Sequence, residues 1–418
     1  MAGNVNGIVP PQHSFYAAIH FIISYIWKRM NLMVKESRLA ASIAAAIAES
    51  VLSGWRIDAK GNRHSVPCIS FLQYMNACLY DDKYGYYRSG PVRVGKAGDF
   101  YTSSGIGGVL AEILAGYALD YGKALGKPLK LIEWGAGTGR LSAQIAEAGR
   151  NRSSEWNEQF QSILIEDHPA HGQAARVAFA NSSSGQLNAE PILVTSEEAW
   201  EASWLREPAL VLANELLDAF SVHRIQRVNG QLLELGVAGD EVQGFYEVHM
   251  PLTDMRISGW LARDGIQLKE GQQTEIHAGA AAFQERLGAV MTKGRLILID
   301  YGHESGEYAA EHRMYGTLMC YWRHQASDSP YIRIGEQDMT SHVPFTFIRH
   351  EAEESGWQAT SFMTQKQFLI EHGVLDLLQN HHSTDPFSTV SRRNRAIRQL
   401  LLSDQMSETF KVMVLEKR

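Results

Sequence analysis

The chain has 418 residues, of which 45% are hydrophobic and 20% are charged, and this balance excludes a disordered or collagen-like chain. Acidic residues outnumber basic ones by 46 to 39, so the net charge is −7. Such mild acidity argues against a nucleic-acid partner and against attraction to an anionic membrane surface.

Residues 1–38 form a leader whose status the sequence leaves open. Its apolar run, residues 15–27, is shorter than the roughly 20 residues of a spanning helix, so we expect no stable membrane insertion. The basic start and the cleavage site of a secretory signal are missing. We interpret the run as an additional amphipathic helix or as the result of a misassigned start, with Met33 as the alternative first residue.

The three cysteines, Cys68, Cys78 and Cys320, form no C-x-x-C pair, so the sequence predicts neither a disulfide framework nor a structural zinc site. None of the histidines has the H-x-x-x-H or H-E-x-x-H spacing of a metal site. We therefore predict no metal, and the cysteine usage indicates a reduced, cytoplasmic setting.

Helices are predicted over residues 39–52, 69–80 and 107–121, where apolar residues recur at helical spacing. Residues 81–101 are rich in glycine, tyrosine and charge and are predicted to be a loop. We expect residues 39–128 to be a helical N-terminal part of the main domain.

Five strongly apolar runs follow and indicate a parallel sheet. Because they are apolar throughout rather than alternating, they suit strands that are buried on both faces. Helices between them would form right-handed crossovers, so the predicted fold class is α/β. The runs are residues 129–134, 162–166, 191–195, 208–214 and 294–302.

The pattern changes at about residues 221–290, which we interpret as an insertion within the core of residues 129–418. This insertion shows hairpin character, with Asn229-Gly230 as the turn signal. The alternating tail, residues 410–418, is predicted to be the last, antiparallel edge strand.

The sharpest local signal is the sequence EWGAGTGR at residues 133–140, which lies between a predicted strand and a predicted helix. Glycine permits a tight turn with positive φ, and a helix start offers free N–H groups to an anionic ligand. The glycines Gly135, Gly137 and Gly139 follow a G-x-G-x-G spacing rather than the G-x-G-x-x-G of a dinucleotide fold. With Glu133 before them, this form is typical of S-adenosylmethionine methyltransferases, although an ordinary βα turn would also contain glycine.

Carboxylates follow two further strands. Glu166 ends the second apolar run and could accept hydrogen bonds from both ribose hydroxyls, a role that Asp167 could take instead. Glu215 and Asp218 follow the fourth run and would share one face if a helical turn began there. Such a pair could bind a guanidinium, or could simply stabilise a helix N-terminus.

His303 and His342 are candidates for positioning an acceptor or removing a proton, or are hydrogen-bonded structural histidines.

Six motifs in this order resemble the MidA-type S-adenosylmethionine-dependent methyltransferases, the family that includes the mitochondrial complex I assembly arginine methyltransferase. The resemblance covers most of the chain from about residue 39. The motifs are YMNACLYDDKYGYY (74–87), GDFYTS (98–103), EWGAGTGRL (133–141), NELLDAFSVH (214–223), IDYGH (299–303) and GEQDMTSHVPF (335–345).

The resemblance implies a Rossmann-like class I methyltransferase core with S-adenosyl-L-methionine as the cofactor and an arginine of a protein as the acceptor. It assigns cofactor binding to the glycine loop and to nearby polar residues, and it makes the residues after the fourth and fifth strands the catalytic candidates. The cofactor-binding candidates are Glu133, Gly135, Gly137, Gly139, Glu166, Asp99, Thr102 and Ser103, and the catalytic candidates are Asn214, Glu215, Asp218 and His303.

The expected function is therefore methylation of a protein substrate, most simply at an arginine nitrogen. The alternative is a non-catalytic assembly or chaperone-like factor that retains the methyltransferase fold. A third function, NAD-dependent oxidation, is disfavoured by the glycine spacing. The sequence leaves the identity of the protein substrate open, and a homodimer is one option for the assembly.

Overall fold

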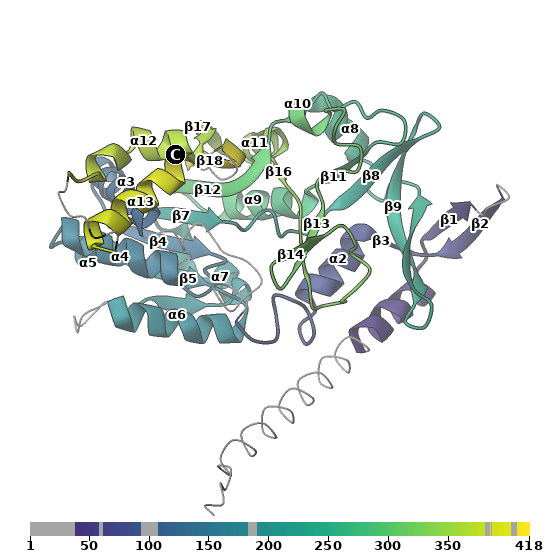
Figure 1. Ribbon diagram of the computed structural model, residues 1–418, viewed down its shortest axis with the longest axis horizontal. Helices are drawn as coiled ribbons and strands as arrows, with labels where there is room; N and C mark the ends of the chain where they lie inside the picture. Colours follow the sequence, from purple (N-terminus) through teal and green to yellow (C-terminus); the bar gives the residue numbers. More distant parts are fainter. Residues whose placement is uncertain are drawn as a thin grey trace, which may run out of the picture.

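The computed structural model describes residues 38–57, 62–92, 108–182, 190–380, 385, 387–402 and 408–418. Figure 1 shows a main sheet flanked by helices and a second, antiparallel sheet beside it. The leader expected at residues 1–38 lies outside the described residues except for its last member, Arg38, which begins a helix over residues 38–49.

The main sheet has the strand order β17–β18–β12–β7–β4–β5–β6, and the five strands from β12 to β6 run parallel. This arrangement confirms the predicted α/β fold. Strand β18 is antiparallel to both β12 and β17, so the prediction of an edge strand was wrong, because β17 pairs with its outer side. The strands are β4 (Leu129–Trp134), β5 (Phe160–Ile165), β6 (Ile192–Val194), β7 (Ala209–Asn214), β12 (Gly294–His303), β17 (Gln358–Thr364) and β18 (Phe410–Lys417).

Helices cover both faces of the main sheet because successive side chains of its strands point to opposite faces and both sets are apolar. In β4, Leu131 packs into one hydrophobic cluster and Ile132 into the other. The Leu131 face is covered by α3 (Val109–Leu125), α4 (Arg140–Arg152), α12 (Gln365–Glu371) and α13 (Thr389–Leu402), and the Ile132 face by α7 (Ser196–Glu201), α8 (Ile257–Arg263), α9 (Ala278–Val290) and α11 (Phe345–Glu354). Helix α6 (Pro169–Ser182) packs against α4 and β5.

The second sheet combines strands from the N-terminal part with strands of the insertion, in the order β11–β8–β9–β10–β1–β2, and β3 pairs with β9. The three N-terminal strands were not predicted. The hairpin turn at Asn229-Gly230 is confirmed, with φ values of 50° and 76° that suit a type I′ turn. The strands are β1 (Ser53–Ile57), β2 (Arg63–Pro67), β3 (Ile69–Ser70), β8 (His223–Val228), β9 (Gln231–Asp240), β10 (Gly244–Met250) and β11 (Gln273–Ile276).

Helix α2 (Phe71–Tyr80) packs between the second sheet and a small third sheet, in a cluster that includes Tyr74, Val237 and Met339. The third sheet has the order β14–β13–β15. Its strands are β13 (Met319–Trp322), β14 (Gln325–Ser327) and β15 (Asp338–Thr340), and the remaining short elements are α5 (Trp156–Gln159), η2 (Ser203–Arg206), α10 (Ser305–Tyr308), β16 (Val343–Pro344) and η3 (Val374–Leu377).

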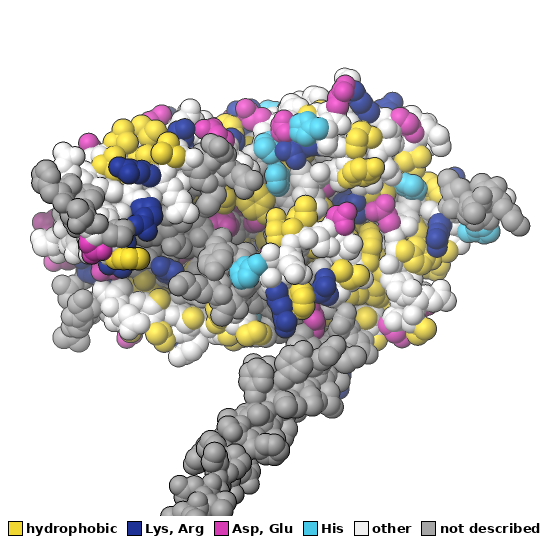
Figure 2. Space-filling view, viewed as in Figure 1, with side chains coloured by type: hydrophobic (Ala, Val, Ile, Leu, Met, Phe, Trp, Pro, Cys, Tyr) yellow, Lys and Arg dark blue, Asp and Glu magenta, His cyan; other side chains and the backbone are white. Residues whose placement is uncertain are grey.

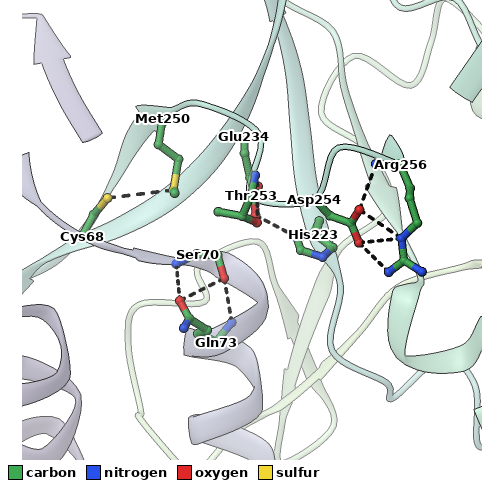
Figure 3. A network of polar contacts seen from close by, with 9 residues as sticks. All are labelled: Cys68, Ser70, Gln73, His223, Glu234, Met250, Thr253, Asp254 and Arg256. Atoms are coloured by element: carbon green, nitrogen blue, oxygen red, sulfur yellow. Dashed lines mark hydrogen bonds and ion pairs between the residues drawn. The ribbon is translucent and has the colours of Figure 1, made fainter. Parts of the chain in front are cut away.

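Two groups of polar contacts hold the start of β8 and the start of α2 (Figure 3). The carboxylate of Glu234, which has no exposed surface, accepts hydrogen bonds from the N–H and the hydroxyl of Thr253 at 2.7 Å and lies 2.7 Å from Nδ1 of His223. Ser70 and Gln73 form a capping box at the start of α2. Both groups of contacts bear on the site described below, because His223 follows directly on the segment after β7 and α2 ends at Tyr80.

Two surface properties bear on partners. Among the described residues, no helix has the length and the apolar character that crossing a bilayer requires. On the face shown in Figure 2, acidic, basic and hydrophobic side chains are interspersed rather than gathered into one field of a single sign.

Candidate active site

A cavity of about 460 Å³ lies at the carboxyl ends of β4, β5 and β7. Ligands in open α/β folds bind at this edge, and the volume is in the range of small-molecule sites. The described part of the lining contains residues 133–138, 165–167 and 214–216 from the three strand ends, together with side chains contributed by the N-terminal part and by the region after β12.

The glycine loop forms one side of this cavity. Gly135, Gly137 and Gly139 have φ values of 70°, 54° and 64°, which residues with a side chain rarely adopt. Gly135 and Gly137 belong to the lining, and a Cβ on Gly137 would meet no atom within 4 Å. Gly139 is absent from the described lining, and a Cβ there would lie 2.6 Å from Cβ of Ala175. The structure therefore gives Gly139 a packing role between α4 and α6 rather than a ligand contact.

Glu133 is the last acidic side chain of β4 and is only 5% exposed. Its Oε2 accepts hydrogen bonds from the backbone N–H of Ser142 at 3.2 Å and from the Ser142 hydroxyl at 2.5 Å. Burial raises the pKa of Glu133 to about 7, although the hydrogen bonds from Ser142 act in the opposite direction. This carboxyl thus lies in the cavity with a proton equilibrium close to neutral pH.

Glu166 and Asp167 both line the cavity where β5 ends. Oε2 of Glu166 accepts the N–H of Gly137 at 2.7 Å, and Oε1 accepts the N–H of His168 at 2.8 Å. Oδ1 of Asp167 accepts the N–H of Ser196 at 2.7 Å. Glu166 therefore fixes the glycine loop directly, a function that the sequence did not indicate.

The segment after β7 bends at Glu215 and forms a hydrogen-bonded turn only at residues 218–219, so the expected helical face of Glu215 and Asp218 does not form. Glu215 has a φ of 52°, which is unfavourable for a residue with a Cβ. Its N–H donates to the carbonyl oxygen of Ile299 at 2.8 Å. Even so, Asn214, Glu215 and Asp218 all line the cavity.

Among the described residues, three buried oxygens of this segment lack a hydrogen-bond partner, namely Oδ1 of Asn214, Oδ1 of Asp218 and Oγ of Ser221, and the first two belong to residues that line the cavity. Burial raises the pKa of Asp218 to about 6, although the hydroxyl of Tyr301 donates a hydrogen bond that lowers it. Burial and the nearby charges of Asp218 and Glu215 raise the pKa of Asp300 well above its ordinary value. The cavity is therefore rich in acidic groups with polar atoms available to a ligand.

The two candidate histidines lie side by side, but only one of them lines the cavity. His342 lines the cavity, whereas His303 is not part of the described lining, and its Nε2 lies 2.8 Å from a guanidinium nitrogen of Arg313. Burial lowers the pKa of both imidazoles to about 4, and the charge of Arg313 contributes in each case. His303 is therefore placed beside the site, with its ring centroid 5.1 Å from that of His342.

Some lining residues were missed or undervalued from the sequence. Tyr80, Tyr301, Tyr321 and Phe410 line the cavity but come from four separate elements, so no local pattern could bring them together. Three cofactor candidates, Asp99, Thr102 and Ser103, fall outside the described residues. Over the part of the chain that the structure describes, no group of three or more potential metal ligands converges.

The fold and the site define an α/β protein with a cofactor cavity at the carboxyl edge of a largely parallel sheet. The model of a family of S-adenosyl-L-methionine-dependent methyltransferases matches residues 113–363, which is more than half of the chain. The protein belongs to this family, and S-adenosyl-L-methionine is its cofactor.

Solved structures and named relatives agree with this assignment. The chain is similar to a Burkholderia thailandensis protein crystallised with S-adenosyl-homocysteine, with a TM-score of 0.79 and 28% identity over 92% of this chain and 93% of that chain. It is also similar to two proteins named as mitochondrial protein arginine methyltransferase NDUFAF7 or its homologue. The Danio rerio protein is 25% identical over 91% of this chain and 89% of its own, and the Drosophila melanogaster protein is 24% identical over 69% and 67%.

The described residues fit this cofactor. The cavity has the volume for a nucleoside-sized ligand, Gly137 leaves open space where a side chain would stand, and Glu133 and Glu166 present carboxylates beside it. Asn214 adds a buried oxygen to which no described residue donates a hydrogen bond. The groups that would hold the cofactor are therefore the glycine loop, Glu133 and Glu166.

Proposed function

We propose that the protein methylates a guanidinium nitrogen of an arginine in a partner protein. The observation that carries this proposal is the placement of Glu215 and Asp218 in the same cavity as the glycine loop, where the buried Oδ1 of Asp218 has no hydrogen-bond partner in the described part of the chain. An arginine side chain keeps its charge in proteins, and paired carboxylates bind it through charge-assisted hydrogen bonds. The names of the relatives, which are protein arginine methyltransferases, support the same acceptor.

Positioning is the main contribution of the chain. The cofactor supplies an electrophilic methyl group on a positively charged sulfur. The glycine loop and Glu166 hold the cofactor side of the cavity, while Glu215 and Asp218 orient the acceptor nitrogen from the other strand end. Alignment of the reacting atoms in a water-excluding cavity can make a large contribution to the rate of such a transfer.

The proton balance assigns a further task to Asp218. The acceptor nitrogen forms one bond to carbon, the carbon–sulfur bond breaks with its electron pair on sulfur, and the nitrogen gives up one proton. Oδ1 of Asp218 has no hydrogen-bond partner among the described residues and can accept that proton. Because burial raises its pKa to about 6, this carboxylate is ionised at neutral pH yet more basic than a solvated aspartate.

A cell lysate incubated with the protein and isotopically labelled S-adenosyl-L-methionine tests the proposal by mass spectrometry. We expect the label on arginine residues of one or a few proteins. Asp218→Asn should reduce labelling about a hundredfold or more, whereas Asp376→Asn, the same change at an exposed aspartate, should leave it unchanged.

Each other outcome has a defined meaning. Label on a different residue type contradicts the arginine acceptor. Cofactor binding without label in any lysate protein contradicts the proposal as a whole and favours a non-catalytic assembly factor.

A further inference from the structure

A second set of cavity-lining residues comes from elements far from the cofactor loop. Tyr80 ends α2, Tyr87 follows in the next loop, Tyr321 lies in β13 and Asp338 begins β15. Asp338 is only 2% exposed. The cofactor role and the carboxylate pair after β7 leave these four side chains without a function.

Printed contacts tie these residues to one another and to the segment after β7. The hydroxyl of Tyr87 donates to Oδ1 of Asp338 at 2.6 Å. The rings of Tyr80 and Tyr87 stack with their centroids 5.6 Å apart. The hydroxyl of Tyr80 donates to the carbonyl oxygen of Ala219 at 2.9 Å, next to Asp218. One stacked tyrosine thus contacts Asp338 and the other the Asp218 turn.

The charges of Asp338 and Asp218 affect the pKa of the same three tyrosines. Burial raises the pKa of Tyr80, Tyr87 and Tyr321, and the negative charges of Asp338 and Asp218 raise it further in all three. Both carboxylates are therefore close to this group of aromatic faces, although they come from β15 and from the bend after β7.

Asp218 offers an open acceptor in this part of the cavity. It is 6% exposed, and among the described residues its Oδ1 has no hydrogen-bond partner. Arg88, a basic residue of the lining, lies 3.5 Å from Asp167 at the end of β5, and its charge also lowers the pKa of Tyr80. A buried carboxylate carries a desolvation cost, which a bound cation would offset.

We propose that Tyr80, Tyr87, Tyr321, Asp218 and Asp338 form an acidic–aromatic cage that receives the cationic side chain of the acceptor, with Asp338 as the residue that selects a guanidinium. A planar guanidinium has five N–H donors and can bridge two carboxylates while its faces contact aromatic rings. This inference rests on the proposed arginine acceptor and adds the residues that recognise it.

The probe is the peptide acetyl-Gly-Gly-Arg-Gly-Gly-amide, titrated by calorimetry into the full chain saturated with S-adenosyl-homocysteine. Asp338→Asn keeps the shape of the side chain and an acceptor for the Tyr87 hydroxyl but removes the charge. We expect it to weaken peptide binding about tenfold or more, since a buried charge-assisted contact is lost. The matched control is Asp328→Asn, which makes the same change at an exposed position beyond β14.

A second probe keeps the test independent of how well the variant folds. The same peptide with citrulline, the neutral isostere of arginine, should bind wild-type protein about tenfold more weakly and should not distinguish it from Asp338→Asn. Tyr87→Phe, which releases Asp338 from its hydrogen bond, should weaken arginine-peptide binding while S-adenosyl-homocysteine affinity is retained.

Three results would overturn the cage: equal affinity of Asp338→Asn and wild type for the arginine peptide, equal affinity of wild type for arginine and citrulline peptides, or no peptide binding by protein that still binds S-adenosyl-homocysteine. The proposed function is tested by a separate readout, which is the type of residue labelled in the lysate. A protein that labels arginine but shows one of these three results would keep its function and lose the cage.

Discussion

The carboxylate of Asp300 holds the backbone of Leu217 in place. Its Oδ2 accepts the N–H of Leu217 at 2.9 Å and the N–H of Asp218 at 3.2 Å. Because these groups are buried, their hydrogen bonds have no substitute in water. The last strand of the parallel set, β12, therefore determines the shape of the bend that carries the proposed acceptor-binding carboxylates.

We predict that Asp300→Ala lowers the free energy of unfolding by about 2–4 kcal/mol, because it leaves two buried N–H groups unsatisfied. Urea unfolding followed by circular dichroism measures this change. Asp300→Asn, which keeps one accepting oxygen, should lose less. An alanine variant as stable as wild type would show that the bend does not depend on Asp300.

Glu133 should make stability depend on pH near neutrality. Its pKa is raised to about 7 in the folded protein by burial, above the ordinary value of 4.5, so the native state binds the proton more tightly than the unfolded state does. The resulting stabilisation is fully present below about pH 4.5 and is lost as the pH rises through 7. Its size is roughly 3 kcal/mol, from the shift in pKa.

The measurement is the difference in unfolding free energy between wild type and Glu133→Gln at several values of pH between 4 and 8. We expect wild type to lose stability relative to the variant as the pH rises, because the glutamine cannot ionise. Parallel pH profiles for the two proteins would contradict a raised pKa at this position.

Substitutions in the glycine loop should distinguish a position needed for ligand binding from a position needed for packing. Gly137→Ala places a methyl group in open space beside the cavity, so we predict weak binding of S-adenosyl-homocysteine with a stability loss of about 1–2 kcal/mol from positive φ alone. Gly139→Ala has the same φ penalty and also meets Ala175 at 2.6 Å, so it should be clearly less stable. Calorimetry and thermal unfolding of both variants provide the comparison, and equal melting temperatures would refute the assigned packing role.

Glu215 should show a conflict between backbone strain and function. With φ at 52°, Glu215→Gly relieves the strain whereas Glu215→Ala keeps it, so the glycine variant should be more stable by about 1 kcal/mol. Both variants lose the carboxylate and should lose lysate labelling equally. Equal stability of the two variants in urea would indicate that this backbone conformation is not maintained in solution.

Local sequence patterns predicted the parallel core well. Strand β4 coincides with the expected residues 129–134. A short apolar run that ends at a glycine, here Gly135, is typical of a buried strand. Strand β17 was missed, since its mostly half-buried side chains mix polar and apolar types without a clear period. Strands β1 and β3 were also missed, because their partners in β10 and β9 lie 194 and 168 residues further along the chain. Strand β2, which pairs with its neighbour β1, was missed as well.

The residues of the site were likewise predicted only in part. The glycine loop was visible because its residues are adjacent in the chain and glycine is required for their φ values. Nothing in the local sequence of Tyr321 or Phe410 indicates a shared cavity, and a glutamate gives no sign of the positive φ at residue 215. His303 was chosen for its position after an apolar run, yet the neighbouring Arg313 occupies its ring nitrogen.

Strand β18 lies between β12 and β17, and the residues at its start, Thr409 and Phe410, line the cofactor cavity. On a translating ribosome these residues emerge after nearly all the rest of the sheet. Until then two neighbouring strands have unpaired edges and one wall of the cavity is missing, a state exposed to edge-to-edge aggregation. The cavity that holds the cofactor is therefore complete only after this strand has been inserted between its two neighbours.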